Sequence, residues 1–136
     1  MTMLTDLVAK LAAESTVTAI VSTRIYPQIL PQAPTFPAIT YNQVSALRVR
    51  DLEGPAGKSR HRISINCWAL TYSAARGLAD AVRRSIDGYG SSFMSDTWVG
   101  SVTLDNEMDL FEEDAGRPNV GIYRVVQDYI ISHLET

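Results

Sequence analysis

The N-terminal part of the chain carries apolar residues in a helical pattern, followed by prolines. Apolar positions spaced three and four residues apart predict one buried face of a helix over residues 2–13. These positions are Leu4, Leu7, Val8 and Leu11. A second apolar group predicts a short helix over residues 16–22. Pro31, Pro34 and Pro37 then exclude further helix, because proline fixes φ and restricts the residue before it.

Strand patterns occur in two pairs. β-Branched and aromatic residues predict a first strand over residues 38–44, and period-two alternation predicts a second over residues 60–70. The same alternation predicts strands over residues 102–110 and 120–132, joined by a turn that contains Gly116 and Pro118. In the third strand the alternation is interrupted at Asn106.

An amphipathic helix separates the two pairs of strands. Apolar residues from Ala75 to Ile86 form a continuous helical stripe. Thr71 or Ser73 can cap its N-terminus, and Gly88 is placed to end it.

The order of these elements predicts the fold class. Two hairpins separated by a helix cannot form a regular parallel sheet. We therefore expect an α+β fold, an antiparallel four-stranded sheet built from two hairpins with helices packed on one face. With 136 residues the chain has the size of one domain, spanning residues 1–136. The other sheet face is expected to be covered by a neighbouring subunit.

The connector inside the first hairpin stands out by its length. It covers residues 46–59, whereas ordinary hairpin loops have about two to five residues. Long loops of this kind are usually functional or disordered. We expect a flexible hairpin loop here.

Composition and charge exclude several classes of protein. The net charge of −3 with 20% charged residues argues against a surface whose total charge drives binding to nucleic acid or to a membrane. Cys67 is the only cysteine, which rules out an intramolecular disulfide and fits folding in a reducing cytoplasm. The N-terminal segment lacks the basic region of a signal peptide, and no stretch is apolar enough to span a bilayer.

Three groups of residues resemble ligand-binding motifs, but each lacks part of the pattern that the motif requires. Gly57-Lys58-Ser59 resembles the end of a phosphate-binding loop, but position 52 is leucine and a strand follows. Asp105, Glu107 and Asp109 have strand spacing and lack the glycine of an EF-hand loop. His61 and His133 lie far apart in the sequence, with no metal-binding motif around them. We therefore expect no catalytic residue, no cofactor and no metal.

Opposite charges are segregated onto the two hairpins. From Arg48 to Arg62, five basic residues and two acidic ones give a local net charge of +3 with His61 neutral. From Asp105 to Asp114 there are six acidic residues and no cation, a local net charge of −6. In a head-to-tail ring, the basic hairpin of one subunit could meet the acidic surface of the next. The residues predicted for this subunit or partner interface are Arg48, Arg50, Lys58, Arg60, Asp105, Glu107 and Asp109.

Two other interpretations of the charges stay open. The hairpins could simply be two solvated loops that keep the protein in solution. Alternatively, the basic loop could face a central channel through which DNA passes, which predicts salt-dependent retention of DNA.

The chain resembles, over nearly its whole length, the tail completion or tail-to-head joining family of long-tailed phages. The resemblance lies in the helical N-terminus, the Arg24-Ile25-Tyr26-Pro27 step, the Pro37-Ala38-Ile39 entry into a strand, and the order of the later elements. It implies a non-enzymatic virion protein with a fold like that of tail terminators. It also implies that the protein assembles as a hexameric ring at the head-proximal end of the tail.

The resemblance also implies partners and a location. The ring would stop polymerisation of the tail tube protein and join the tail to the head-tail connector protein, with DNA passing through its lumen and no membrane involved. Two alternatives remain: a small ligand-binding or enzymatic α+β domain, which would show activity as a monomer, and a dimeric bacterial interaction module, which would form no ring.

Overall fold

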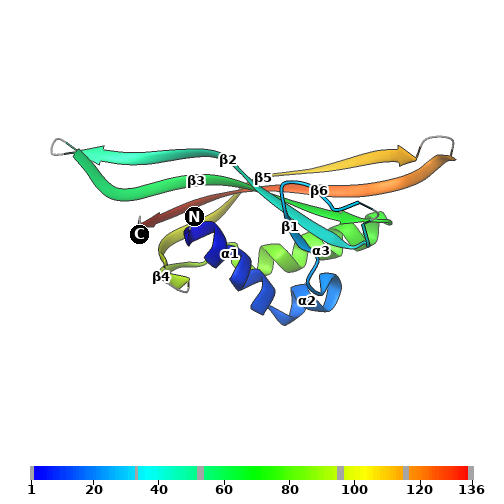
Figure 1. The fold of residues 1–136 in the computed structure, drawn as a ribbon, viewed down its shortest axis with the longest axis horizontal. Helices are drawn as coiled ribbons and strands as arrows, with labels where there is room; N and C mark the ends of the chain where they lie inside the picture. The colour runs from blue at the N-terminus through cyan, green and yellow to red at the C-terminus, as the bar shows by residue number, and fades with distance from the viewer. Residues whose placement is uncertain (1, 33, 52–53, 95–96, 115–116, 135–136) are drawn as a thin grey trace.

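The computed structural model describes residues 2–32, 34–51, 54–94, 97–114 and 117–134 (Figure 1). Side chains are outside this description at residue 2 and at residues 48–51, 54–58, 114 and 117–120. The elements, in chain order, are α1 (Thr2–Ala13), α2 (Ser15–Val21), β1 (Ile25–Pro27), β2 (Ala38–Asp51), β3 (Gly54–Ala69), α3 (Tyr72–Ile86), β4 (Gly90–Met94), β5 (Thr97–Asp114) and β6 (Arg117–Leu134).

The sheet has six strands in the order β1-β2-β3-β6-β5-β4. It is mixed, because β1 pairs parallel to β2 while all other neighbours are antiparallel. The α+β class and the two hairpins are confirmed, but the expectation of a four-stranded antiparallel sheet is wrong. The sequence did not reveal β1, which has three residues, or β4, which lies in a polar, glycine-containing segment. Both are edge strands whose pairing depends on a longer neighbour.

The predicted loop over residues 46–59 is mostly strand. The pairing of β2 with β3 continues to Asp51 opposite Gly54, with irregularities between Gln43 and Ser45 and between Val49 and Arg50. Residues 52–53 lie outside the described residues. The local sequence suggests a loop because Gly54, Pro55 and Gly57 are typical turn residues. In the structure, the pairing of the two strands extends to this segment, where Pro55 lies opposite Arg50 and Gly54 opposite Asp51.

All three helices lie on one face of the sheet, as predicted (Figure 1). The predicted helix over residues 2–13 is confirmed as α1, and Thr71 is the N-cap of α3, its Oγ1 accepting a hydrogen bond from the amide of Ala74 at 3.2 Å. Gly88 follows the end of α3 with φ of +83°, a conformation that favours glycine.

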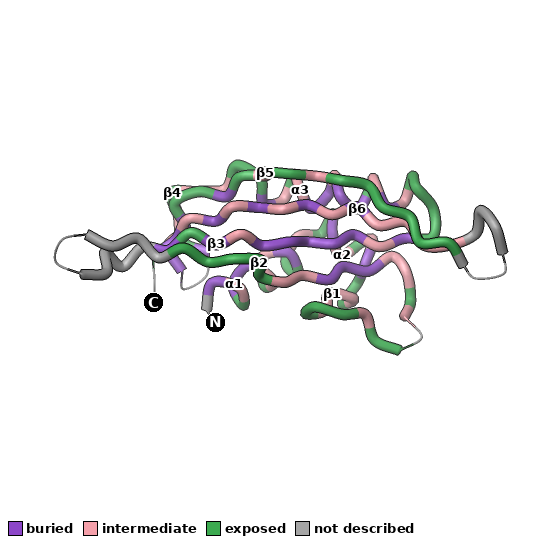
Figure 2. Tube along the Cα trace, turned by 90° about the horizontal axis from the view of Figure 1, so that it is seen from above, coloured by how far each residue is buried: buried purple, intermediate pink, exposed green. Residues whose placement is uncertain are grey.

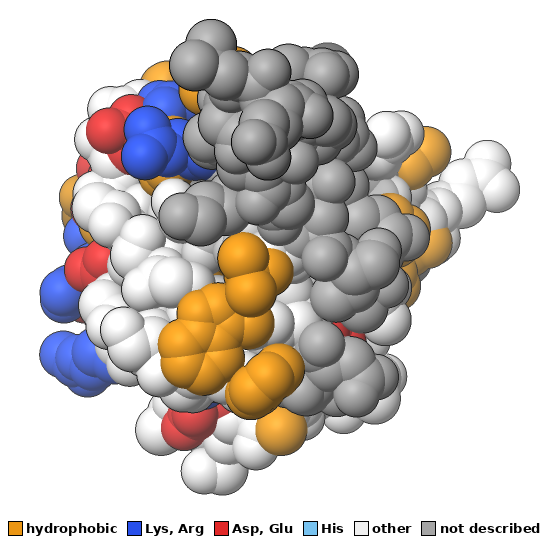
Figure 3. Space-filling view, turned by 90° about the vertical axis from the view of Figure 1, so that its left-hand side faces the viewer, with side chains coloured by type: hydrophobic (Ala, Val, Ile, Leu, Met, Phe, Trp, Pro, Cys, Tyr) orange, Lys and Arg blue, Asp and Glu red, His pale blue; other side chains and the backbone are white. Residues whose placement is uncertain are grey.

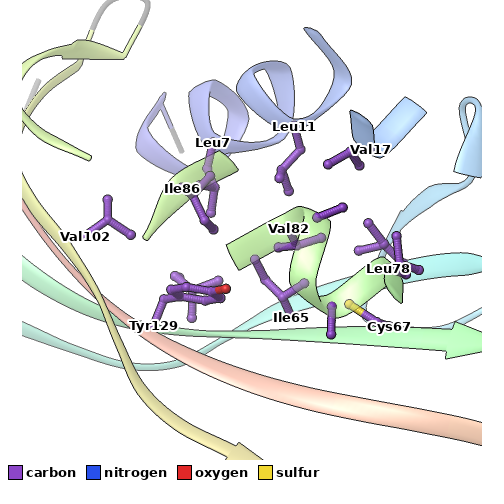
Figure 4. Close-up of a cluster of buried hydrophobic side chains, with 14 of the residues drawn as sticks. Leu7, Leu11, Val17, Ile65, Cys67, Leu78, Val82, Ile86, Val102 and Tyr129 are labelled. Carbon is purple, nitrogen blue, oxygen red and sulfur yellow. The ribbon is translucent and has the colours of Figure 1, made fainter. Parts of the chain in front are cut away.

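The core lies between the helices and the middle of the sheet. Leu78, Val82 and Ile86 of α3 pack against the helix side of β3 and β6, where Ile65 and Tyr129 are fully buried (Figure 4). Leu7 and Leu11 of α1 close the far side of α3 (Figure 4). Figure 2 shows the buried residues concentrated in the middle of the sheet. The helices thus cover only the central part of a much longer sheet.

Cys67 points into this core, on the same face of β3 as Ile63 and Ile65. Burial raises the pKa of its thiol well above the ordinary value. A buried thiol with a raised pKa is an inert packing group at neutral pH.

A bulge in β5 changes which side chains face the helices. Val102 and Leu104 lie opposite Ile131 and Tyr129 on the helix side, but the register shifts between Leu104 and Asn106. Beyond the shift, the helix side is occupied by the residues opposite Gln127 and Val125, which are Glu107 and Asp109. The interruption of the pattern at Asn106 is the trace of this bulge.

We predict that Leu78→Ala lowers the free energy of unfolding by about 2–5 kcal/mol, because it opens a cavity beneath α3 in the fully buried core. Urea denaturation followed by circular dichroism measures the change. The matched control is Leu70→Ala just before the helix, where the side chain is 61% exposed and the change should stay within about 0.5 kcal/mol. Equal effects at the two positions would contradict this description of the core.

Candidate interaction surfaces

Two-stranded arms extend the sheet at opposite ends (Figure 1). The pairing of β3 with β6 runs from Lys58 opposite Leu134 to Ala69 opposite Tyr123. Beyond Lys58, β3 pairs only with β2, and before Tyr123, β6 pairs only with β5. We call these the β2–β3 arm and the β5–β6 arm.

The residues of the predicted basic surface lie on or next to the β2–β3 arm. Arg48 is opposite Ser59 in the ladder, and Lys58 is opposite Val49. The side chains of Arg48, Arg50 and Lys58 lie outside the described residues. Arg60 is described: its side chain is exposed, and it makes no ion pair with any residue whose side chain the structure describes.

The three predicted acidic residues do not share one face. The bulge after Leu104 puts Asp105 on the open side of the sheet, where it meets Arg62, while Glu107 and Asp109 face the helix side, where they meet Arg76. The strand spacing of the three residues predicts that they project from one face, and this prediction is wrong. Simple alternation fails here because one extra residue reverses the facing of every side chain that follows.

A hydrogen-bonded network surrounds Glu107 and Asp109. Arg76 of α3 contacts both carboxylates, at 3.0 Å and 3.4 Å. Gln127 donates from Nε2 to Glu107 at 2.7 Å, and Tyr72 donates its hydroxyl to Asp109 at 2.9 Å. The hydrogen bond to Asp109 raises the pKa of Tyr72. Burial lowers the pKa of Arg76, but the hydrogen bond and the charge of Glu107 outweigh it, so the pKa is raised.

Asp105 is likewise compensated within the subunit. Arg62 of β3 lies 2.6 Å from Asp105 and 3.5 Å from Asp128. The hydrogen bond that Arg62 donates to Asp105 is the main cause of the raised pKa of Arg62. The predicted acidic strip is thus largely neutralised by Arg62 and Arg76, and a role of these carboxylates between subunits stays a prediction.

An apolar pocket lies at the end of the sheet that carries the β2–β3 arm. Its volume is about 340 Å³, and its lining residues are Ser59, Arg60, Trp98, Gly100, Ser132, His133 and Leu134. Trp98 packs edge-on against Phe93, which is 64% exposed. Figure 3 shows hydrophobic side chains gathered on this end of the molecule.

An aromatic cluster lies at the opposite end, where the β5–β6 arm begins. Tyr123 contacts both Phe111 and Tyr72, with ring centroids 4.7 Å and 6.1 Å away. Phe111 is 41% exposed. The sequence analysis did not single out this cluster, since its three residues are contributed by β5, β6 and α3 and become neighbours only in the folded sheet.

The pair His61 and His133, distant in the sequence, is brought together in the structure. Their ring centroids are 4.7 Å apart, and both rings are buried. Each Nδ1 has a hydrogen-bonding partner, Gln43 Oε1 for His61 and the carbonyl of Leu134 for His133. Among the described residues no group of three or more His, Cys, Asp or Glu side chains could hold a metal ion.

The two ends of the sheet carry charged groups and exposed aromatic rings, among them Phe93 and Phe111. In the described part of the chain, no helix is long and apolar enough to cross a membrane. What the arrangement supplies is a pair of complementary ends, one with an apolar pocket and a cation, the other with an aromatic cluster and carboxylates.

We predict that Arg76→Ala lowers the free energy of unfolding by about 1–3 kcal/mol, because Glu107 and Asp109 lose their shared cation. Thermal or urea denaturation measures the loss. Arg84→Ala, an exposed position on the same helix, serves as the control and should change stability by less than about 0.5 kcal/mol. A loss no larger than that of Arg84→Ala would show that the network does not stabilise the fold.

Comparisons with known proteins agree with this architecture. A solved chain in the structure entitled "Virion of native gene transfer agent (GTA) particle" has the same fold, with a TM-score of 0.74 over 94% of this chain and 91% of that chain, at 14% identity. No curated protein matches the sequence significantly. The family model described as tail completion protein gp17 matches residues 5–133. The resemblance found in the sequence is thereby confirmed, and the chain belongs to the tail completion protein gp17 family, as a structural protein of phage tails.

Proposed function

We propose that this protein forms a closed ring, hexameric by family resemblance, at the head-proximal end of a phage tail. There it stops elongation of the tail tube and provides the surface that meets the head-tail connector protein. It acts as a structural part of the virion and not as an enzyme. The tail tube protein and the connector are its partners, and the ring surrounds the path along which DNA passes.

The observation that carries this proposal is the opposite projection of the two arms from the helix-covered centre (Figure 1). A subunit with different surfaces at its two ends associates head to tail, and such contacts close into a ring when the rotation between neighbours permits it. Membership of the tail completion family places this geometry in the tail of a phage-like particle.

Charge supports the same direction of assembly. The segment around the β2–β3 arm has a net charge of +3 over residues 48–62, and the β5 segment has −6 over residues 105–114. Part of this charge is paired inside the subunit, where Arg62 holds Asp105 and Arg76 holds Glu107 and Asp109. Because these segments reach opposite ends of the sheet, head-to-tail contact brings unlike charges together, whereas head-to-head contact brings like charges together.

The edges of the sheet also favour assembly. β1 and β4 are the edge strands, and among the described residues neither pairs with a strand on its outer side. Edge strands with exposed apolar residues are sites where chains associate. Ile29, just beyond β1, is 77% exposed, and Phe93 on β4 is 64% exposed.

Assembly with tail tubes tests the proposed function directly. We expect negative-stain images of the purified protein to show rings, and mixtures with tail tube protein to show tubes capped at one end and no longer growing. Tubes that elongate equally with and without this protein would overturn the function, and so would a protein that binds only along the side of tubes.

Charge reversal tests how the subunits associate. We predict that Arg48→Glu, Arg50→Glu and Arg60→Glu together abolish the ring, because like charges then meet across each contact. Light scattering measures the molar mass. Adding Glu113→Arg to the same chain should recover part of the assembly, since Glu113 is exposed and makes no ion pair with a described side chain, whereas Glu112 lies beside Arg124. Unchanged assembly of the triple variant would remove the electrostatic contact from the proposal.

A further inference from the structure

The pocket beside the β2–β3 arm has the character of a receptor for an apolar side chain next to an acid. Trp98 and Leu134 provide apolar lining, and Leu134 is 41% exposed. Arg60 lines the same pocket and makes no ion pair with the described side chains. A large exposed apolar surface with a charged rim is typical of a protein contact site.

The β5–β6 arm carries the complementary groups. Phe111 is 41% exposed although it packs against Tyr123. Glu113, two residues further, is exposed and has no ion pair among the described side chains. The other acids near it are already engaged, since Glu112 lies 3.9 Å from Arg124 and Asp109 contacts Arg76. Glu113 is therefore a carboxylate still available to a cation of another subunit.

The register determines which faces can meet. Phe111 and Glu113 lie opposite Tyr123 and Gly121, on the side of the sheet that the helices cover further along. Arg60 is opposite Ser132, and these two positions face the open side of the sheet at the other end. Phe111 and Glu113 of one copy can therefore meet Arg60 of another when the helix side of the β5–β6 arm lies on the open side of the next sheet.

The two strands of this arm come close together at its base. A Cβ atom at Gly121 would clash with the carbonyl oxygen of Glu112 across the ladder. The two strands therefore approach each other more closely here than a side chain would allow.

We infer that the pocket binds the β5–β6 arm of a second copy, with Phe111 against Trp98 and Leu134 and with Glu113 beside Arg60. This contact rests on the proposed ring and names the groups that join its subunits. It is heterologous, because each copy offers its arm at one end and its pocket at the other, so the contact repeats around the assembly. The aromatic ring supplies the anchor, and the ion pair sets the direction.

Cross-linking tests the contact. A chain with Phe111→Cys and Leu134→Cys should form, under mild oxidation, a ladder of disulfide-linked oligomers on non-reducing gels, since each copy bonds to the next. Cys67 does not interfere because it is buried and the pKa of its thiol is raised. The control pairs Phe111→Cys with Ile29→Cys, which is more exposed than Leu134 and lies away from the pocket.

Single substitutions give a second measurement. We expect Phe111→Ala to weaken self-association roughly 30-fold in sedimentation experiments, the effect of losing an interface anchor. Leu110→Ala is the matched control, because Leu110 is 37% exposed and adjacent but lies on the opposite face of the arm. Glu113→Lys should also weaken association, and Arg60→Glu in the same chain should restore it.

The outcomes separate this contact from the proposed function. Both experiments are run with the protein alone and with tail tubes present. Rings that cap tubes, combined with no cross-linking above the control, overturn the Phe111 contact and leave the ring function standing. Absence of both rings and tube capping with the unsubstituted protein overturns the function itself. Cross-linking in the Phe111 and Leu134 variant together with the effect of Phe111→Ala supports the contact.

Discussion

The antiparallel pairing of β3 with β6 is the interaction on which the shape of this protein depends. β3 begins at the tip of the first hairpin, and β6 begins at the tip of the second. Because the two strands pair antiparallel, from Lys58 with Leu134 to Ala69 with Tyr123, the hairpin tips must lie at opposite ends of the sheet. The helices cover only the middle, where residues of both strands face α3 (Figure 4). The two arms therefore extend beyond the helices, at the ends where we propose that subunits meet.

Charge is used differently in the centre and at the ends of the sheet. In the centre, Arg62 and Arg76 each hold two or more carboxylates within one subunit. Such partly buried networks fix the positions of neighbouring elements, here α3 on β5 and β3 on β6. At the ends, Arg60 and Glu113 make no ion pair among the described side chains. Charged side chains in the centre thus stabilise the subunit, and those at the ends are the ones that we propose to join subunits.

The bulge in β5 determines which carboxylates of this strand pair inside the subunit. It turns Glu107 and Asp109 toward α3, where Arg76 and Tyr72 bind them, and leaves Asp105 on the open side with Arg62. Without the extra residue, Met108 would point toward the helices and the carboxylates would gather on the open face. A single irregularity in register therefore decides whether a strand of alternating acids is an exposed strip or an internal network.

The sequence alone determined the elements with strong periodicity. The helical spacing of Leu7 and Leu11 and the period-two alternation of β3 each correspond to one buried face, with Leu4 partly buried beside it. The overall resemblance to the tail completion family was also present in the order of these elements. Such features depend on local periodicity, which the chain carries wherever it packs.

Three features became visible only in the tertiary structure: the short strands β1 and β4, the length of the two hairpins, and which charged side chains pair. β1 and β4 exist because a longer strand offers them a partner, and residues 46–51 are strand because the ladder with β3 continues through them. The cluster of Tyr72, Phe111 and Tyr123 and the pocket of Trp98 and Leu134 bring together residues far apart in the chain. Sequence reasoning missed them because the facing of a side chain after a bulge, and its neighbours across strands, are set by register and not by local pattern.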